Sequence, residues 1–351
     1  MLASLAALVA VSQSSEGLPY VSLPTLDLGI PIQPFGVIVA IGVLIGAEVM
    51  RRYALRHGVE EDDLRGLTGW VVVTGFLGAH VFDIVAYERD RWLGAPGIKA
   101  DPLLILKVWD GISSYGGFIG GGLGFMFYLW WKRLTPGMWA DATGVGLLLG
   151  FSIGRIGCTL VHDHIGRATT SSLGVDYPVN VLERHQLIGE IGRQHAVLDA
   201  AGNSVIRAHN MAMYELAYLI PVNALVLYLA FQKKRRLAAG FIGVLIGLSY
   251  APVRFVLEYW RLNESDERYA GMTFAQYSSI VFFLIAGYAA WRLYQNGNPA
   301  PTTAELGGRA GGRYASLAAL AKAQAAGAKT DDDAAAAKTD DDAAKPKPKK
   351  K

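Results

Sequence analysis

Long apolar stretches separated by short polar ones make up most of this chain of 351 residues. Several of them approach the roughly 20 apolar residues that a helix needs to cross a bilayer. The pattern predicts about seven membrane-spanning helices, at residues 34–50, 70–87, 112–131, 139–157, 213–231, 241–259 and 277–294. We therefore expect an all-α, multi-pass membrane protein, because the pattern leaves no apolar stretch from which to build a soluble core.

The composition agrees with this class of protein. Charged residues make up 18% of the chain, against about 25% in soluble domains. The single cysteine excludes an internal disulfide. Residues 1–11 are apolar but lack a basic leading region, so we expect residues 1–33 to form an interfacial, outward-facing segment rather than a cleaved signal peptide.

The basic residues predict the orientation in the membrane. They follow the first, third, fifth and seventh spans, as Arg51, Arg52, Arg56 and Arg65, then Lys132 and Arg133, then Lys233, Lys234, Arg235 and Arg236, then Arg292. By the positive-inside rule these exits are cytoplasmic, with the N-terminus outside and the C-terminus inside. The helical domain then covers residues 34–295, with a periplasmic cap at 159–212. The repetitive segment at 296–351 is expected to be a disordered cytoplasmic tail without a catalytic role.

Two arginines are the strongest candidates for chemistry. Arg155 ends an apolar run, where an ionisable side chain is costly unless it has a function or a partner. Arg254 lies inside the sixth span, and the spacing of Glu258 and Arg261 predicts that all three share one helical face. This set is either a self-neutralising structural ion pair or a ligand for phosphate, which a guanidinium matches in shape. If Arg155 and Arg254 converge, they form a clamp for an anionic lipid.

Other polar and small residues near the spans each allow two interpretations. Gly116 and Gly117 begin the third span, where they either let two helices approach closely or offer backbone amides to a headgroup. Tyr115 is a hydrogen-bond donor and proton relay, or a buried interfacial tyrosine. His209, before the fifth span, is an interface anchor or part of a headgroup pocket.

The sequence His162-Asp163-His164 contains possible acid–base groups. We expect no metal here, because the alternation lies in a loop without further spaced ligands. Either histidine can act as a general base near neutral pH. Cys158 is expected to be a small buried residue rather than a nucleophile.

Several motifs together resemble one known family, the prolipoprotein diacylglyceryl transferases. The family signature resembles Gly-Arg-(Ile/Leu)-Gly-Asn-Phe-Ile-Asn-Gly-Glu-x-x-Gly-Arg. The stretch from Gly154 to Arg167 has the same length, with Asp163 in place of the glutamate. It retains Gly154, Arg155, Gly157, Gly166 and Arg167. Further motifs agree in order over residues 23–294: Trp109-Asp110-Gly111, then Tyr115 to Gly120, then His209 to Glu215, then Arg254, Glu258 and Arg261, then Gly271 to Gln276.

This resemblance implies seven spans with the N-terminus outside, and an enzyme of the bacterial inner membrane. The family moves the sn-1,2-diacylglyceryl group from phosphatidylglycerol to the lipobox cysteine of prolipoproteins, which is the first step of lipoprotein maturation. It implies membrane lipid and prolipoprotein signal peptides as partners, no nucleic acid, and no metal or other cofactor. Arg155 and Arg254 would stabilise the leaving phosphate, with the base left open among Tyr115, Asp163 and a nearby histidine. The lipid site would include Arg155, Gly116, Gly117, Gly154, Gly157, Gly166, Glu258, Arg261 and His209.

Four positions depart from the family pattern. Tyr115 replaces a histidine, Cys158 an asparagine, Phe35 a tyrosine and Ala212 a glutamine. One alternative is therefore a catalytically degenerate paralogue that binds anionic lipid without transferring it. A small transporter is a second alternative, although the sequence shows no inverted repeat.

Overall fold

A computed structural model describes residues 17–23, 26–27, 31–108, 111, 113–199, 201–232, 237–262 and 268–297. Several predictions lie outside these residues. They concern the segment 1–16, the basic cluster at 233–236, and the tail from 298 onward, together with Trp109 and Asp110 of one family motif.

All seven predicted apolar stretches are helical. The long helices are α2 (Pro34–Arg56), α3 (Glu61–Ala86), α5 (Ser114–Lys132), α6 (Pro136–Val161), α9 (Met211–Phe231), α10 (Phe241–Leu257) and α11 (Phe274–Asn296). Arg65, expected in a loop, lies inside α3, which begins earlier than predicted. Its first turn carries Glu61, Asp62 and Asp63, and acidic side chains stabilise the positive end of a helix dipole.

Six helices of the described chain are long and apolar enough to cross a membrane. The exception is α5, whose 19 residues include several glycines and tryptophans that reduce its hydropathy. The large apolar side chains exposed on α2 and α11, such as Leu44 and Leu284, suit contact with lipid rather than water. The protein is thus a multi-pass membrane protein. The count of seven spans depends on α5 and remains a prediction.

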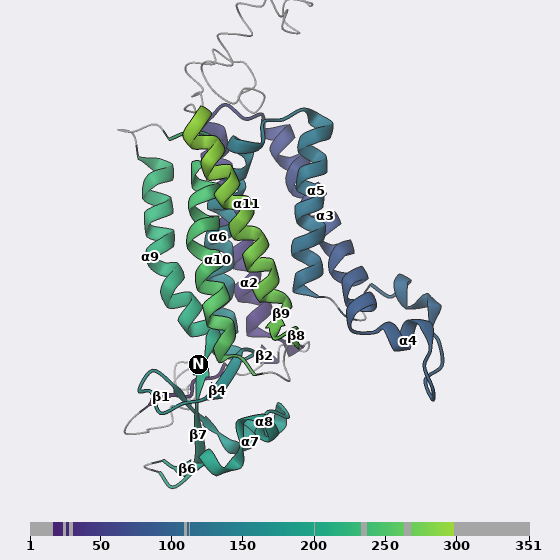
Figure 1. The fold of residues 1–351 in the computed structure, drawn as a ribbon, viewed down its shortest axis with the longest axis vertical. Coiled ribbons are helices and arrows are strands. Elements are labelled where there is room, and N and C mark those ends of the chain that lie inside the picture. Colours follow the sequence, from purple (N-terminus) through teal and green to yellow (C-terminus); the bar gives the residue numbers. More distant parts are fainter. Residues whose placement is uncertain are drawn as a thin grey trace, which may run out of the picture.

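The helices pack as closely approaching pairs. Helix α2 packs on α6, α3 on α5, and α10 on α11, while α9 lies against α6 and α10 (Figure 1). Between α2 and α6 the backbones meet at glycines, and a Cβ on Gly42 would lie 2.8 Å from the carbonyl oxygen of Gly150. The main core surrounds α6, where Met138 and Trp139 are fully buried.

A small β-sheet caps one end of the bundle, which the hydropathy pattern did not predict (Figure 1). Its strands are β1 (Leu18–Pro19), β4 (Ile165–Ala168), β5 (Val175–Pro178), β6 (Val197–Leu198) and β7 (Ser204–Asn210). The order is β1-β5-β7-β4, with β6 on β7, and only β1 and β5 are parallel. Tyr177, Leu182 and Ile206 form its buried core, with α7 (Val179–Arg184) and α8 (Ile188–Ile191) beside it. A bridge between Gly166 and Arg261 ties the cap to the segment that follows α10.

Shorter elements complete the described chain. They are the strand pairs β2 (Leu26–Asp27) with β3 (Pro31–Ile32) and β8 (Arg268–Tyr269) with β9 (Met272–Thr273), the helix α4 (Arg89–Leu93), and the 3-10 turns η1 (Pro102–Leu106), η2 (Arg193–His195) and η3 (Glu258–Trp260).

Candidate active site

Arg155 lies in the last two turns of α6, at the capped end of the bundle, with its side chain 10% exposed. Its Nε is 2.9 Å from Oε2 of Glu215 on α9, and the guanidinium carbon lies 4.8 Å from the centre of the Phe151 ring. These contacts offset the cost of burying the Arg155 guanidinium, since a cation away from water needs a counter-charge. The hydropathy pattern predicted Arg155 at a membrane boundary, but nothing local in the sequence indicated its partner.

Glu215 joins three helices. It is 2% exposed on α9, contacts Arg155 of α6, and accepts a hydrogen bond from the Tyr250 hydroxyl of α10. Neither Glu215 nor Tyr250 was among the predicted site residues. The signal was present for Glu215, because an acid inside an apolar span is a candidate functional residue.

A second charged group lies at the end of α10. Glu258, fully buried, is 2.6 Å from Nη1 of Arg254 and 3.5 Å from Nη1 of Arg261. The prediction of one helical face is correct for Arg254 and Glu258 but wrong for Arg261. Helix α10 ends at Leu257, a 3-10 turn follows, and Arg261 has an extended backbone. Arg261 reaches Glu258 because the chain turns back over it.

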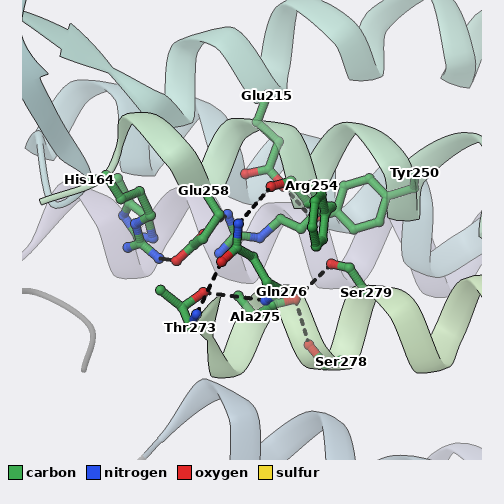
Figure 2. Close-up of polar contacts among 12 residues, drawn as sticks. His164, Glu215, Tyr250, Arg254, Glu258, Thr273, Ala275, Gln276, Ser278 and Ser279 are labelled. Carbon is green, nitrogen blue, oxygen red and sulfur yellow. Dashed lines mark hydrogen bonds and ion pairs between the residues drawn. The ribbon is translucent and has the colours of Figure 1, made fainter. Parts of the chain in front are cut away.

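The two charged groups converge. Glu215 contacts Arg155 directly, and its charge also acts on Arg254. Figure 2 shows Glu215, Tyr250, Arg254 and Glu258 grouped above the first turn of α11, with His164 at one side. Counting these side chains alone, three arginines face two glutamates here, which is an excess of one positive charge in a buried setting. Such a cluster favours an anion, because charges interact more strongly away from bulk water.

The start of α11 supports this cluster from one side. Thr273 and Gln276 form a reciprocal capping box, in which each side chain bonds the other residue's backbone. Gln276 is fully buried, and its amide lies 3.5 Å from the Phe255 carbonyl oxygen of α10. This contact fixes α11 against the segment that carries Arg254.

The chain reverses just after Arg155, which returns His164 to it. Helix α6 ends at Val161, and His162 adopts a left-handed conformation with φ of 56°. His164 Nε2 then lies 3.3 Å from Arg155 Nη1, and its Nδ1 lies 2.5 Å from Asp163 Oδ1. Cys158, Asp163 and His164 place their potential ligand atoms within 4.8 Å of one another. In the described arrangement, however, the Asp163 carboxylate and His164 Nδ1 bond each other.

His162 belongs to the cap rather than to the charged cluster. Its Nε2 lies 2.7 Å from the Val21 carbonyl oxygen, and its Nδ1 lies 3.2 Å from the Asn210 amide. The ring stacks on Tyr20. Burial lowers the pKa of His162, which favours the neutral ring.

His209 lies on strand β7 of the cap and is half-buried. Its Nδ1 lies 2.9 Å from the Tyr214 hydroxyl, which donates in turn to the Leu173 carbonyl, and its ring lies beside Trp260. Burial lowers the pKa of His209 as well.

Tyr115 packs edge-on against Phe274 and lies near enough to Arg254 to interact with it electrostatically.

Two of the predicted glycines, Gly116 and Gly166, lie at close backbone approaches, and the others face side chains. Gly116 meets Gly78 of α3, Gly117 faces Ala79, and Gly166 packs under the Trp260 carbonyl. On α6, Gly154 faces Val39, and a Cβ on Gly157 would lie 2.9 Å from the Phe35 ring. Helix packing therefore accounts for Gly116 and Gly157. The proposed role of the glycines in lipid binding remains a prediction.

Comparison with known proteins gives this geometry a family. The family model of prolipoprotein diacylglyceryl transferase matches residues 24–292. The chain belongs to the prolipoprotein diacylglyceryl transferase family. It is 27% identical to the phosphatidylglycerol–prolipoprotein diacylglyceryl transferase of Treponema denticola, over 66% of this chain and 75% of that protein. It is also 27% identical to the second such transferase of Streptomyces coelicolor (76% and 78% covered) and 25% identical to that of Thermosynechococcus vestitus (79% and 94% covered).

The family match covers the helices that carry the charged cluster. The match includes α6, α9 and α10, which together supply Arg155, Glu215 and Arg254. In this chain the charged cluster therefore lies on three separate helices, at the end of the bundle covered by the cap sheet (Figure 1).

Proposed function

We infer that this protein transfers the diacylglyceryl group of phosphatidylglycerol to a prolipoprotein. Its family and the names of its relatives support this activity. In the structure, one observation carries the inference: Arg155 and Arg254 come from different helices into one buried cluster with excess positive charge. A phosphodiester headgroup is an anion that such a cluster would bind.

The reaction sets clear electrostatic requirements. The cysteine sulfur of the acceptor attacks the diacylglyceryl carbon that bears the phosphate ester. A carbon–sulfur bond forms as the carbon–oxygen bond to phosphate breaks, and glycerol phosphate leaves with the electron pair. Negative charge grows on the phosphate oxygens during this step, so donors held in place before the reaction lower its barrier. We assign that role to Arg155 and Arg254.

The two glutamates would hold these arginines in position. Glu215 and Glu258 are almost fully buried, and each contacts one side of a guanidinium. The lipid phosphate would bind from the other side, where it would compete with the contact between Arg155 and His164. Arg261, which contacts Glu258, would contribute a further positive charge to the site. His209, beside Trp260, would line the pocket for the headgroup. Tyr115, half-buried near Arg254, would donate a hydrogen bond to the headgroup.

The proposed acceptor is the lipobox cysteine of a prolipoprotein signal peptide. Because the nucleophilic sulfur belongs to the substrate, the enzyme needs no cysteine of its own. We propose that the protein lies in the bacterial cytoplasmic membrane with the capped end outward, since the basic ends of α2 and α5 lie at the opposite end of the bundle (Figure 1).

A transfer assay tests this function. The purified protein is mixed with phosphatidylglycerol and a lipobox peptide, and the peptide mass is read, with a serine-for-cysteine peptide as control. A thiol-dependent gain of one diacylglyceryl group is expected. Lipid binding without any gain would instead identify a degenerate, lipid-binding paralogue.

A further inference from the structure

The ring of His164 has a defined hydrogen-bonding direction. Arg155 can only donate, so the His164 Nε2 at 3.3 Å must accept, and the ring proton is then on Nδ1. That proton faces Asp163 Oδ1 at 2.5 Å. The result is a carboxylate–imidazole pair whose basic nitrogen faces the charged cluster, as in other enzymes where a carboxylate orients a histidine base.

We propose that His164 is the general base that takes the proton of the acceptor thiol, with Asp163 as its positioning residue. This proposal rests on the transferase function proposed above, and it resolves the choice among Tyr115, Asp163 and the histidines. It also explains how the chemistry proceeds where Tyr115 stands in place of the family's histidine.

The other candidates are less suitable on geometry or basicity. A tyrosine is a weak base at neutral pH because its phenol stays protonated, and a carboxylate is a poor proton acceptor from a thiol. Among the histidines within the described ranges, His162 and His80 have both ring nitrogens engaged by protein groups, and His209 bonds Tyr214. Of the histidines in the described ranges, only His164 directs a ring nitrogen at Arg155.

The contact with Arg155 links the base to lipid binding. In this structure the Nη1 group of Arg155 donates to Nε2 of His164. A phosphate bound at the Arg155 guanidinium would compete with Nε2 for that N–H group. Binding of the lipid would therefore free Nε2 for the thiol. His164 keeps 23% of its side chain exposed, so a peptide can approach it. The thiol proton moves to Nε2, the thiolate attacks carbon, and the imidazolium can return the proton to the departing phosphate.

Substitution His164→Asn tests the proposal, since asparagine keeps a donor for Asp163 but lacks the basic nitrogen. At pH 7 we expect kcat to fall about 10²-fold or more, in line with the usual contribution of a general base. The loss should shrink as the pH rises toward about 8.5, where the thiol ionises unaided. Phosphatidylglycerol binding should stay within about twofold, and the exposed His195→Asn should behave as wild type.

A second variant guards against misfolding. His164→Gly should be nearly inactive and regain activity when free imidazole is added, which a structural role does not predict. Equal rates for His164→Asn and wild type across pH 6–9 would overturn the proposal while leaving the arginine clamp intact. Loss of wild-type activity on treatment with a chelator would also overturn it, since His164 would then hold a metal with Cys158 and Asp163. An inactive wild type would instead remove the transferase function itself.

Discussion

At the scale of single residues, the site depends on acids that orient arginines. Arg155 and Arg254 stood out in the sequence because charge inside an apolar run is expensive. Their partners were only partly predictable. Glu258 follows Arg254 by one helical turn, so its spacing alone indicated the pair. Glu215 contacts Arg155 across two helices, and no local pattern contains that information.

Substitution Glu215→Gln should destabilise the protein. It removes the counter-charge from a buried arginine, and breaking one side of a buried ion pair costs about 3 kcal/mol. Thermal unfolding in detergent measures the effect, and the exposed Glu60→Gln is the matched control. An unchanged midpoint for Glu215→Gln would mean that Arg155 does not depend on this carboxylate.

At the scale of elements, hydropathy predicted the helices well because the bilayer fixes their length. The glycines of the third span indicated close packing, and α3 and α5 do meet at such residues.

The cap sheet was not predicted from the sequence. Its strands are two to seven residues long, and their pairing joins residues as distant in sequence as Leu18 and Val175. The position of Arg261 was also predicted wrongly, because its spacing from Arg254 and Glu258 suggested a helix that in fact ends at Leu257.

Two glycines of α5 offer a matched test of this packing. A Cβ at Gly120 would collide with the Thr74 carbonyl and lie 2.9 Å from the Gly78 Cα, whereas Gly122 faces open space. We expect Gly120→Val to lower the unfolding temperature by several degrees and Gly122→Val to change it little. Equal effects of the two substitutions would contradict the observed pairing of α3 with α5.

The stability of the cap should depend on pH through His162. Burial lowers its pKa below the usual value of about 6.5. The charge of His185 acts in the same direction, while Asp163 and the bond to Val21 oppose it. The unfolded cap therefore binds a proton more readily than the folded one. The free energy of unfolding should fall as the pH drops below about 6.5 toward the folded pKa. Hydrogen exchange of β5 and β7 at pH 7.5 and 5.5, corrected for intrinsic rates, measures this change.

A control variant isolates the contribution of His162. His162→Gln cannot gain a proton in this range, so its cap should show a weaker pH dependence. His209, whose pKa is also lowered by burial, should contribute a change of the same sign. A wild-type cap that is equally protected at both pH values would contradict the prediction.

At the scale of the whole molecule, the basic helix ends and the cap lie at opposite ends of the bundle (Figure 1). The sequence predicted this polarity from charge alone, because the positive-inside rule needs no tertiary structure. The sequence did not predict how a cap of β-strands would pack over the arginines. That arrangement depends on the bridge between Gly166 and Arg261 and on the turn at His162.

Cysteine labelling tests the orientation. In a Cys158→Ser background, Gln194→Cys lies on the exposed cap and Glu60→Cys lies between α2 and α3 at the other end. A membrane-impermeant maleimide should label the cap cysteine on intact cells and the Glu60→Cys protein only after permeabilisation. The reverse pattern would place the site inside.

The central claim is that buried arginines make phosphate a leaving group. The most direct measurement is the transfer assay on Arg155→Ala, with folding checked by thermal unfolding and with wild type alongside. We expect transfer to fall by about 10²-fold or more, the size of a lost electrostatic contact in a transition state, while the protein stays folded. Near-normal transfer by a folded Arg155→Ala protein would contradict the clamp.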